Sequence, residues 1–144
     1  MDSTSKVLLI VDDSPLDRAV LSGIFSDLYE IREADNGKTA LEILQKLEKG
    51  RIAMILLDVV MPVLDGMGLL KEMRRQELHL NVPVLLLTAS PSPEIIRQGC
   101  EMGVHDILNK PFNRDIIRRR VENLIELQEY RLDLEKTVQA NGKN

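Results

Sequence analysis

Short aliphatic runs alternate along this chain with longer segments in which apolar residues recur at helical spacing. Three runs consist almost entirely of aliphatic residues, at positions 7–11, 53–57 and 84–87. Strands that are buried on both faces of a sheet show this pattern, because neither face meets water. Two weaker strands are predicted at residues 29–34 and 105–108.

Amphipathic helices are predicted in the intervals between these runs. Ser14 and Ser92 are each followed by proline, which gives an N-cap and a first helical residue. Gly50 is expected to end the second helix as its C′ residue. The chain end at residues 139–144 is expected to be frayed. The predicted helices cover residues 15–28, 37–49, 66–76, 93–103 and a last segment that starts after Pro111 and runs almost to the C-terminus.

The strict alternation of strands and helices predicts an α/β fold, with a parallel sheet covered by helices on both faces and joined by right-handed crossovers. A length of 144 residues fits one domain and little more. Hydrophobic residues make up 44% and charged residues 29%, which is typical of globular proteins.

Charge and hydropathy exclude several classes of function. The net charge is −4, so the chain has no overall attraction to nucleic acid or acidic membranes. The arginine run 118–120 is interpreted as a solvated helix face. No apolar stretch approaches the roughly 18–20 residues of a membrane span, and residues 1–11 lack the pattern of a signal peptide. We therefore expect a cytoplasmic protein without direct nucleic-acid or membrane binding.

Polar side chains follow the predicted strands at the edge where an open parallel sheet holds its site. The first strand ends in Asp12 and Asp13, the third in Asp58. The fourth ends in Thr88 and the fifth in Lys110. Taken alone, an Asp-Asp pair after a strand is most often an exposed turn or a helix cap. The four strand ends together favour a site.

Three clustered carboxylates repel one another and raise each other's pKa unless a cation joins them. Mg²⁺ prefers such oxygen ligands. Lys110 adds a charge for a phosphoryl oxygen and Thr88 a hydroxyl donor. A carboxylate nucleophile with these neighbours indicates phosphoryl transfer.

Removal of either Asp12 or Asp13 would relieve the repulsion among the three carboxylates. We therefore expect it to leave the stability of the metal-free protein unchanged or higher.

The strand-end motifs closely resemble those of the receiver domains of two-component response regulators, over about residues 5–125. Each motif alone is weak, but their order and spacing fit together. The matching segments are Leu8-Leu9-Ile10-Val11-Asp12-Asp13, Leu57-Asp58, Met61-Pro62, Asp65-Gly66, Leu87-Thr88-Ala89 and Lys110-Pro111-Phe112.

The resemblance implies a flavodoxin-like (βα)5 fold with strand order 2-1-3-4-5, an order for which a receiver protein is a known example. It implies that Asp58 accepts a phosphoryl group from a sensor histidine kinase or phosphotransfer protein. Asp12, Asp13, Asp58 and the backbone carbonyl of Val60 would hold Mg²⁺, with Mn²⁺ as an alternative.

The resemblance also assigns the phosphoryl-binding and switch positions. Thr88, Ala89 and Lys110 would bind the phosphoryl group, and the Lys110–Pro111 bond would be cis. The family often has Tyr or Phe three residues before the lysine, where this chain has Ile107. Ile107 has no ring to follow the motion of Thr88, which puts the usual form of the switch in doubt.

Two other classes compete with a signalling receiver. A phosphatase of the haloacid dehalogenase type needs a second Asp two residues after the nucleophile, and position 60 is Val. A pseudo-receiver acts as an interaction module without phosphorylation, but usually lacks one of the acidic pair, the acceptor or the lysine. We therefore expect a phosphoacceptor that turns over no outside substrate and has at most autophosphatase activity.

The last helix continues past the end of a typical receiver. We assign residues 1–125 to the receiver and 126–144 to a helical extension, a candidate linker to an output module. Ile117, Leu124, Arg131 and Val138 share one heptad position, and Leu127 and Leu134 another. This seam favours pairing with a second helix over the alternative of a solvated overhang. The face of the fourth helix and fifth strand is a second candidate surface for a homodimer.

Overall fold

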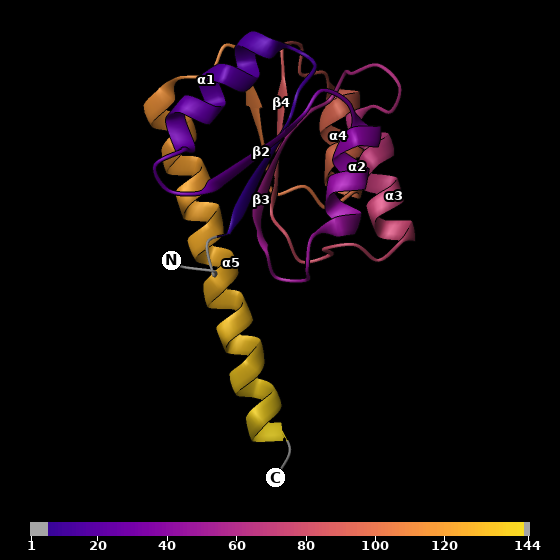
Figure 1. Cartoon of the computed structure of the whole chain (residues 1–144). Coiled ribbons are helices and arrows are strands. Elements are labelled where there is room, and N and C mark those ends of the chain that lie inside the picture. Colours follow the sequence, from indigo (N-terminus) through magenta and orange to yellow (C-terminus); the bar gives the residue numbers. More distant parts are fainter. Residues whose placement is uncertain (1–5, 143–144) are drawn as a thin grey trace.

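The computed structural model describes residues 6–142, which form a parallel sheet with helices on both faces (Figure 1). The five strands lie in the order β2-β1-β3-β4-β5. The flavodoxin-like fold predicted from the sequence is therefore confirmed. The strands are β1 (Val7–Val11), β2 (Glu30–Ala34), β3 (Ile52–Asp58), β4 (Val84–Thr88) and β5 (Asp106–Asn109).

The helices lie in two layers, with two on one face of the sheet and three on the other (Figure 1). One face is covered by α1 and α5, and the other by α2, α3 and α4. Their bounds are α1 (Pro15–Phe25), α2 (Gly37–Lys46), α3 (Gly66–Arg75), α4 (Pro93–Glu101) and α5 (Arg114–Gly142).

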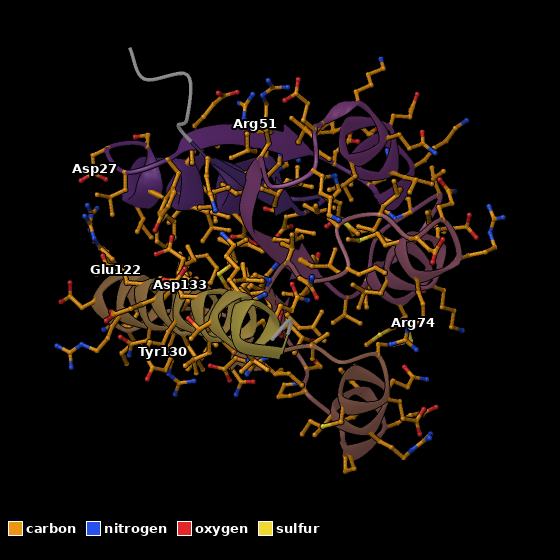
Figure 2. The ribbon with its side chains drawn as sticks, turned by 90° about the horizontal axis from the view of Figure 1, so that it is seen from below. Asp27, Arg51, Arg74, Glu122, Tyr130 and Asp133 are labelled. Carbon is orange, nitrogen blue, oxygen red and sulfur yellow. The ribbon has the colours of Figure 1, made fainter. Side chains whose placement is uncertain are left out.

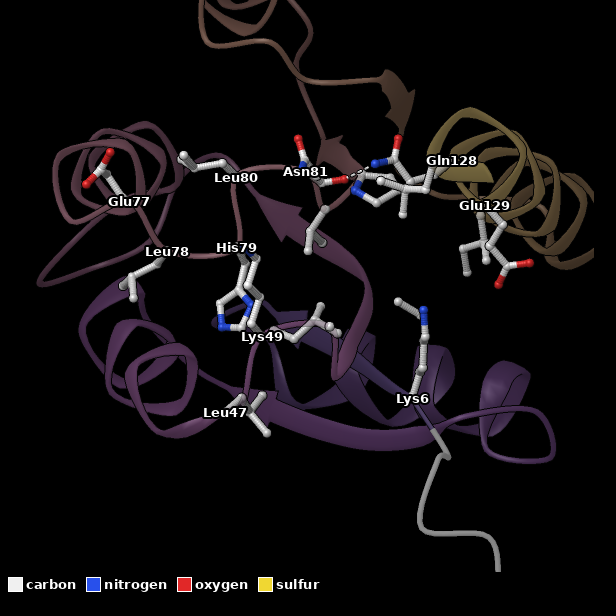
Figure 3. Close-up of a pocket in the computed structure, with 17 residues that line it drawn as sticks. Lys6, Leu47, Lys49, Glu77, Leu78, His79, Leu80, Asn81, Gln128 and Glu129 are labelled. Atoms are coloured by element: carbon white, nitrogen blue, oxygen red, sulfur yellow. Dashed lines mark hydrogen bonds between the residues drawn. The ribbon is translucent and has the colours of Figure 1, made fainter. Parts of the chain in front are cut away.

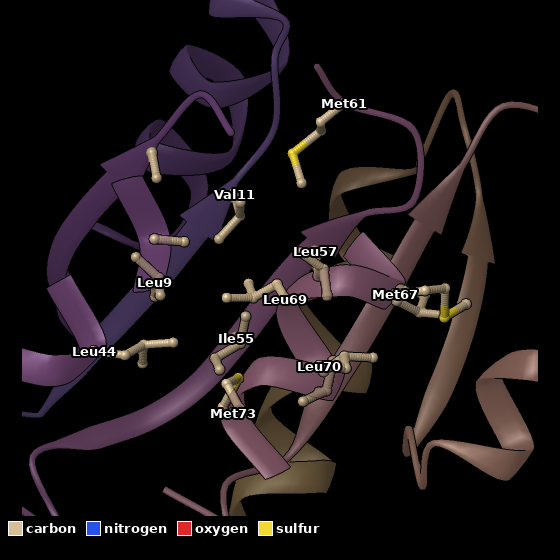
Figure 4. Packing of buried hydrophobic residues seen from close by; sticks show 14 of the residues in the cluster. Leu9, Val11, Leu44, Ile55, Leu57, Met61, Met67, Leu69, Leu70 and Met73 are labelled. Atoms are coloured by element: carbon tan, nitrogen blue, oxygen red, sulfur yellow. The ribbon is translucent and has the colours of Figure 1, made fainter. Parts of the chain in front are cut away.

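Two apolar clusters separate the sheet from its helix layers. Alternate residues of β1 enter different clusters: Leu8 and Ile10 pack on the α1 and α5 side, and Leu9 and Val11 on the other. Figure 4 shows the second cluster, where α2 and α3 pack on β1 and β3. Every residue of β1, β3 and β4 is buried, which explains their continuous apolar sequences.

Side-chain caps fix where the helices begin after the strand ends. Ser14 Oγ accepts a hydrogen bond from the backbone N–H of Asp17 at 3.2 Å, which starts α1 directly beyond β1. Asn36 and Asp65 cap α2 and α3 in the same way, and Ser92 caps α4. The caps predicted at Ser14 and Ser92 are confirmed.

Two predicted helix ends are wrong. Helix α2 ends at Lys46, because Leu47 takes an extended conformation with ψ of 138°. Gly50 has the expected positive φ of 88°, but it lies in the turn before β3 and does not cap the helix. The fraying expected from residue 139 is also wrong as far as Gly142, because α5 continues to that residue. Residues 143 and 144 lie outside the described part of the chain.

Helix α5 is anchored at its start and projects beyond the body at its end (Figure 1). Ile117, Val121 and Ile125 are buried against β1, β3 and α1. The heptad seam predicted to include Ile117 and Leu124 is therefore wrong for those residues, which pack into the domain's own core. Within residues 6–142, no helix combines the length and the apolar character needed to cross a bilayer.

Candidate functional site

Three carboxylates meet beyond the ends of β1 and β3. These strands pair directly, with Val11 opposite Leu57, so the next residues Asp12 and Asp58 lie side by side. Oxygen atoms of Asp12, Asp13 and Asp58 all lie within 4.8 Å of one another. Asp12 and Asp58 are buried, whereas Asp13 is exposed. The structure thus brings together the acidic cluster predicted from the strand ends.

Asp12 is fixed by hydrogen bonds to both of its carboxylate oxygens. Its Oδ1 accepts from the backbone N–H of Ser14 at 2.9 Å, and its Oδ2 accepts from Lys110 Nζ at 2.7 Å. Arg18 Nη1 donates to the Asp12 carbonyl at 2.7 Å. Asp12 is therefore part of the loop structure as well as a candidate ligand.

Lys110 reaches the carboxylates from the end of β5. Its backbone N–H donates to the carbonyl of Thr88 at 2.8 Å, which ties the ends of β4 and β5 together. Its Nζ lies 2.7 Å from Asp12 Oδ2, 2.9 Å from Asp17 Oδ2 and 3.7 Å from Asp58 Oδ2. The Lys110–Pro111 peptide bond is cis in the structure. Burial lowers the pKa of the Lys110 ammonium, but its carboxylate partners outweigh this and raise the pKa, so the group stays charged.

Asp58 is a carboxyl group in an environment that disfavours its charge. Burial, followed by the nearby charge of Asp12, raises the pKa of Asp58 to about 6. Lys110 and a backbone hydrogen bond from Val60 act in the opposite direction. A cation placed among the carboxylates would favour the ionised, nucleophilic form of Asp58.

The loop after β3 passes very close to the Asp58 backbone. The N–H of Gly66 donates to the carbonyl of Val59 at 3.0 Å. A Cβ atom at Gly66 would lie only 2.5 Å from the carbonyl oxygen of Asp58, so a side chain cannot be accommodated there. Asp65 caps α3 by accepting a hydrogen bond from the backbone N–H of Gly68 at 2.8 Å. Val60 is 71% exposed in the same loop, and its assignment as a carbonyl ligand stays a prediction.

Thr88 is the last residue of β4, and Ala89 follows it. Thr88 is buried, and its Oγ1 accepts from the backbone N–H of Ser90 at 3.2 Å. Ala89 is exposed. Ile107 is half-buried and faces α4, where its Cδ1 would be 3.3 Å from a Cβ on Gly99. Their assigned roles toward a phosphoryl group stay predictions.

The sequence did not reveal two further residues of the site. Asp17 contacts Lys110, and Arg18 contacts the Asp12 backbone and forms an ion pair with Glu33. Both lie in the first turns of α1, which the Ser14 cap places over the acidic edge. The predicted cap at Ser14 was the available signal, since it places the start of α1 directly after the acidic pair.

The donor set fits a magnesium ion. Three carboxylates supply hard oxygen ligands, and Mg²⁺ commonly combines one or two such ligands with waters and phosphate oxygens. The exposed Asp13 keeps one side of the cluster open to solvent. Asp12, Asp13 and Asp58 are the residues that would hold the ion.

A separate groove lies at the opposite end of the sheet (Figure 3). It has a volume of about 410 Å³ and lies between the α3–β4 loop, the start of β3 and α5. Gln128 on α5 donates a hydrogen bond to the carbonyl of Asn81 across it. The groove lacks any residue of the acidic cluster, so the chemistry belongs to the other end of the sheet.

The strand order is the flavodoxin-like order that is also found in the receiver protein CheY. Residues 8–122 match the family model described as the response regulator receiver domain. This chain belongs to the response regulator receiver domain family.

One curated relative is the probable cyclic di-GMP phosphodiesterase of Vibrio cholerae, with 35% identity over 120 residues. The match covers 83% of this chain and 26% of that protein. The chain thus spans about a quarter of that relative's length.

Two solved structures place the fold among receivers. The chemotaxis protein CheY4 of Vibrio cholerae has 34% identity and a TM-score of 0.75, with 83% of this chain and 98% of that chain covered. The receiver domain of the sensor histidine kinase PA1611 from Pseudomonas aeruginosa has 29% identity and a TM-score of 0.74, with 85% and 98% covered. That structure has a magnesium ion coordinated in its active site cleft.

Proposed function

We propose that this chain accepts a phosphoryl group on Asp58 from a sensor histidine kinase or a phosphotransfer protein, in a Mg²⁺-dependent reaction, and changes conformation as a result. The observation that carries the proposal is the meeting of three carboxylates with the Lys110 ammonium. The magnesium ion in the PA1611 receiver domain supports the choice of metal, with Mn²⁺ as an alternative.

In the proposed reaction, a carboxylate oxygen of Asp58 attacks phosphorus and the bond between phosphorus and the donor atom breaks. Asp58 forms an acyl phosphate, and the donor leaves with its electron pair. Lys110 stabilises negative charge on one phosphoryl oxygen, and the hydroxyl group of Thr88 donates a hydrogen bond to another. Bound Mg²⁺ would supply positive charge to the phosphoryl oxygens and to the carboxylates.

The direct test is incubation with a small phosphodonor, with and without Mg²⁺. Intact-mass measurement should show one phosphoryl group added only with the metal, and none in Asp58→Asn. Label that persists in Asp58→Asn would refute the acceptor assignment. If the wild type takes no label from any donor, the alternative of a phosphorylation-independent interaction module holds instead.

The switch would involve the α4 and β5 face. Ile107 packs against α4 at Gly99, so movement of Thr88 toward a phosphoryl group would change packing next to that contact. A receiver has two populated conformations, and phosphorylation favours one of them. Ile107 would transmit the change by aliphatic packing.

We propose that the receiver ends at residue 125. We also propose that the part of α5 beyond this residue is a contact surface. Among the α5 side chains whose burial the structure describes, up to residue 139, Ile125 is the last buried one. Beyond it, the exposed Leu127, Tyr130, Leu134 and Val138 recur at helical spacing. Tyr130 points away from the body in Figure 2. A second copy of this helix would bury that stripe, and a homodimer through the α4 and β5 face is the other arrangement.

The remaining assignments follow from this role. The domain would work in the cytoplasm, where histidine kinases deliver their phosphoryl groups, and would contact neither nucleic acid nor membranes directly. It would release its phosphoryl group to water at most slowly and would act on no outside substrate. The helical extension at residues 126–144 would link it to an output module.

A further inference from the structure

The Lys110 ammonium lies near three carboxylates, those of Asp12, Asp17 and Asp58. Asp58, whose phosphoryl group Lys110 would have to contact, is the most distant of the three. The Nζ atom of Lys110 lies 2.9 Å from Asp17 Oδ2 and 3.7 Å from Asp58 Oδ2. Both Lys110 and Asp17 are mostly shielded, with 15% and 30% of their side chains exposed. An ion pair of this kind is stronger than one in open solvent.

Asp17 does not make the hydrogen bond that is usual for an acidic residue at its position in the first turn of a helix. It is the third helical residue after the Ser14 cap, where an acidic side chain often returns a hydrogen bond to the backbone N–H of the cap. Here the Ser14 N–H donates to Asp12 Oδ1 at 2.9 Å. The Asp17 carboxylate instead turns to Lys110, which joins the start of α1 to the end of β5.

We propose that Asp17 is a positioning residue that holds Lys110 away from Asp58 in the unphosphorylated receiver and must release it when a phosphoryl group arrives. This inference rests on the proposed phosphorylation of Asp58. A phosphoryl oxygen on Asp58 would need the Lys110 ammonium, and Asp17 competes for the same charge. Asp17 thereby favours the unphosphorylated state.

Helix polarity offers a simpler explanation for Asp17. A carboxylate in the first turn of a helix is stabilised by the helix dipole, whatever it contacts. That explanation predicts a loss of stability in Asp17→Asn but no change in the affinity of Asp58 for a phosphoryl group. The two explanations therefore differ in a binding measurement.

Beryllofluoride is the probe, because it binds a carboxylate as a mimic of the acyl phosphate. We expect Asp17→Asn to bind beryllofluoride about three- to tenfold more tightly than wild type in Mg²⁺, since one competing ion pair is removed. Asp17→Glu keeps the charge and should restore the wild-type affinity. Asp115→Asn is the matched control, because it makes the same change at an exposed position of the first turn of α5.

A double-mutant cycle without metal tests whether Asp17 acts through Lys110. The unfolding of wild type, Asp17→Asn, Lys110→Gln and the double variant is measured in chelator. Non-additive changes in the unfolding equilibrium would demonstrate the pair, whereas simple repulsion between Asp17 and a phosphoryl group would leave the changes additive.

The outcomes separate this inference from the proposed function. Equal beryllofluoride affinities for wild type and Asp17→Asn, or additive unfolding, would overturn the role of Asp17 and leave phosphorylation of Asp58 standing. A wild type that binds no beryllofluoride in Mg²⁺ would overturn both. The inference is supported if Asp17→Asn binds beryllofluoride more tightly than wild type while Asp17→Glu and Asp115→Asn do not, and if Asp17 and Lys110 are coupled in unfolding.

Discussion

The Nζ atom of Lys110 lies 3.7 Å from Oδ2 of Asp58, and this ion pair joins the ends of two strands that are not neighbours in the sheet. Strand β4 lies between β3 and β5, and it ends in Thr88. A group attached to Asp58 would therefore meet side chains from three adjacent strands. Each of them can be tested by substitution.

The raised pKa of Asp58 gives the metal-free protein a characteristic pH dependence. Its pKa rises from 3.8 to about 6 on folding, so the folded state holds this proton more tightly than the unfolded state. Ionising Asp58 therefore costs folding free energy. This cost is absent below about pH 4, grows as the pH rises, and is complete above about pH 6.

Asp58→Asn cannot ionise and should escape this cost. Relative to wild type, the variant should gain on the order of 2–3 kcal/mol of unfolding free energy between about pH 4 and pH 7. Chemical denaturation in chelator at several pH values measures the difference. A difference that stays constant over this range would contradict the assigned pKa.

Asp12 and Asp13 should respond differently to truncation. The sequence predicted that either could be removed without loss of metal-free stability, but the structure ties Asp12 to the Ser14 N–H and to Lys110. We expect Asp12→Ala to lower the metal-free stability by about 1–3 kcal/mol, because buried partners lose their hydrogen bonds.

Asp13→Ala should leave that stability unchanged or raise it, because the exposed Asp13 carboxylate adds repulsion. Both variants should bind Mg²⁺ more weakly in a calorimetric titration. Thermal unfolding in chelator provides the stability comparison. Equal losses of stability in the two variants would show that Asp13 also has a structural role.

Ile107→Tyr should change how the α4 and β5 face responds to the activated state. The larger ring has to be placed beside Gly99, where a Cβ atom would lie only 3.3 Å from the Cδ1 atom of the isoleucine. Amide hydrogen exchange with and without beryllofluoride should therefore differ between the variant and wild type at α4 and β5. Ile107→Leu keeps the volume and serves as the control. Identical responses in all three proteins would remove position 107 from the switch.

The exposed stripe on α5 should support self-association. A double variant, Leu127→Gln with Leu134→Gln, should weaken any dimer without unfolding the monomer, because both side chains are largely exposed, at 52% and 48%. Leu28→Gln makes the same substitution at 48% exposure in a residue that is not part of α5. Sedimentation equilibrium over a wide concentration range compares them. If wild type stays monomeric throughout, the stripe is not a dimer contact.

The fold could be predicted because buried parallel strands leave an unmistakable apolar signature, as in Val7–Val11. The acidic edge followed from the same signature, since polar residues directly after such strands must meet. The heptad seam failed at Ile117 and Leu124, because the spacing that suits a coiled coil also suits packing on a sheet. The Asp17 contact was not predicted, since it joins a helix start to a strand end 93 positions away (110 minus 17).

The uninterrupted α5 would act as a lever if its anchored part tilted. It is 29 residues long, and the part after Ile125 extends roughly 25 Å at 1.5 Å per residue. A tilt of about 10° at its last buried turn would move the far end by about 4 Å. Each residue also rotates the helix by about 100°, so the residue count sets the angular phase of anything fused to that end. Inserting seven residues, about two turns, would nearly keep the phase, whereas inserting two would point the same group to the opposite side.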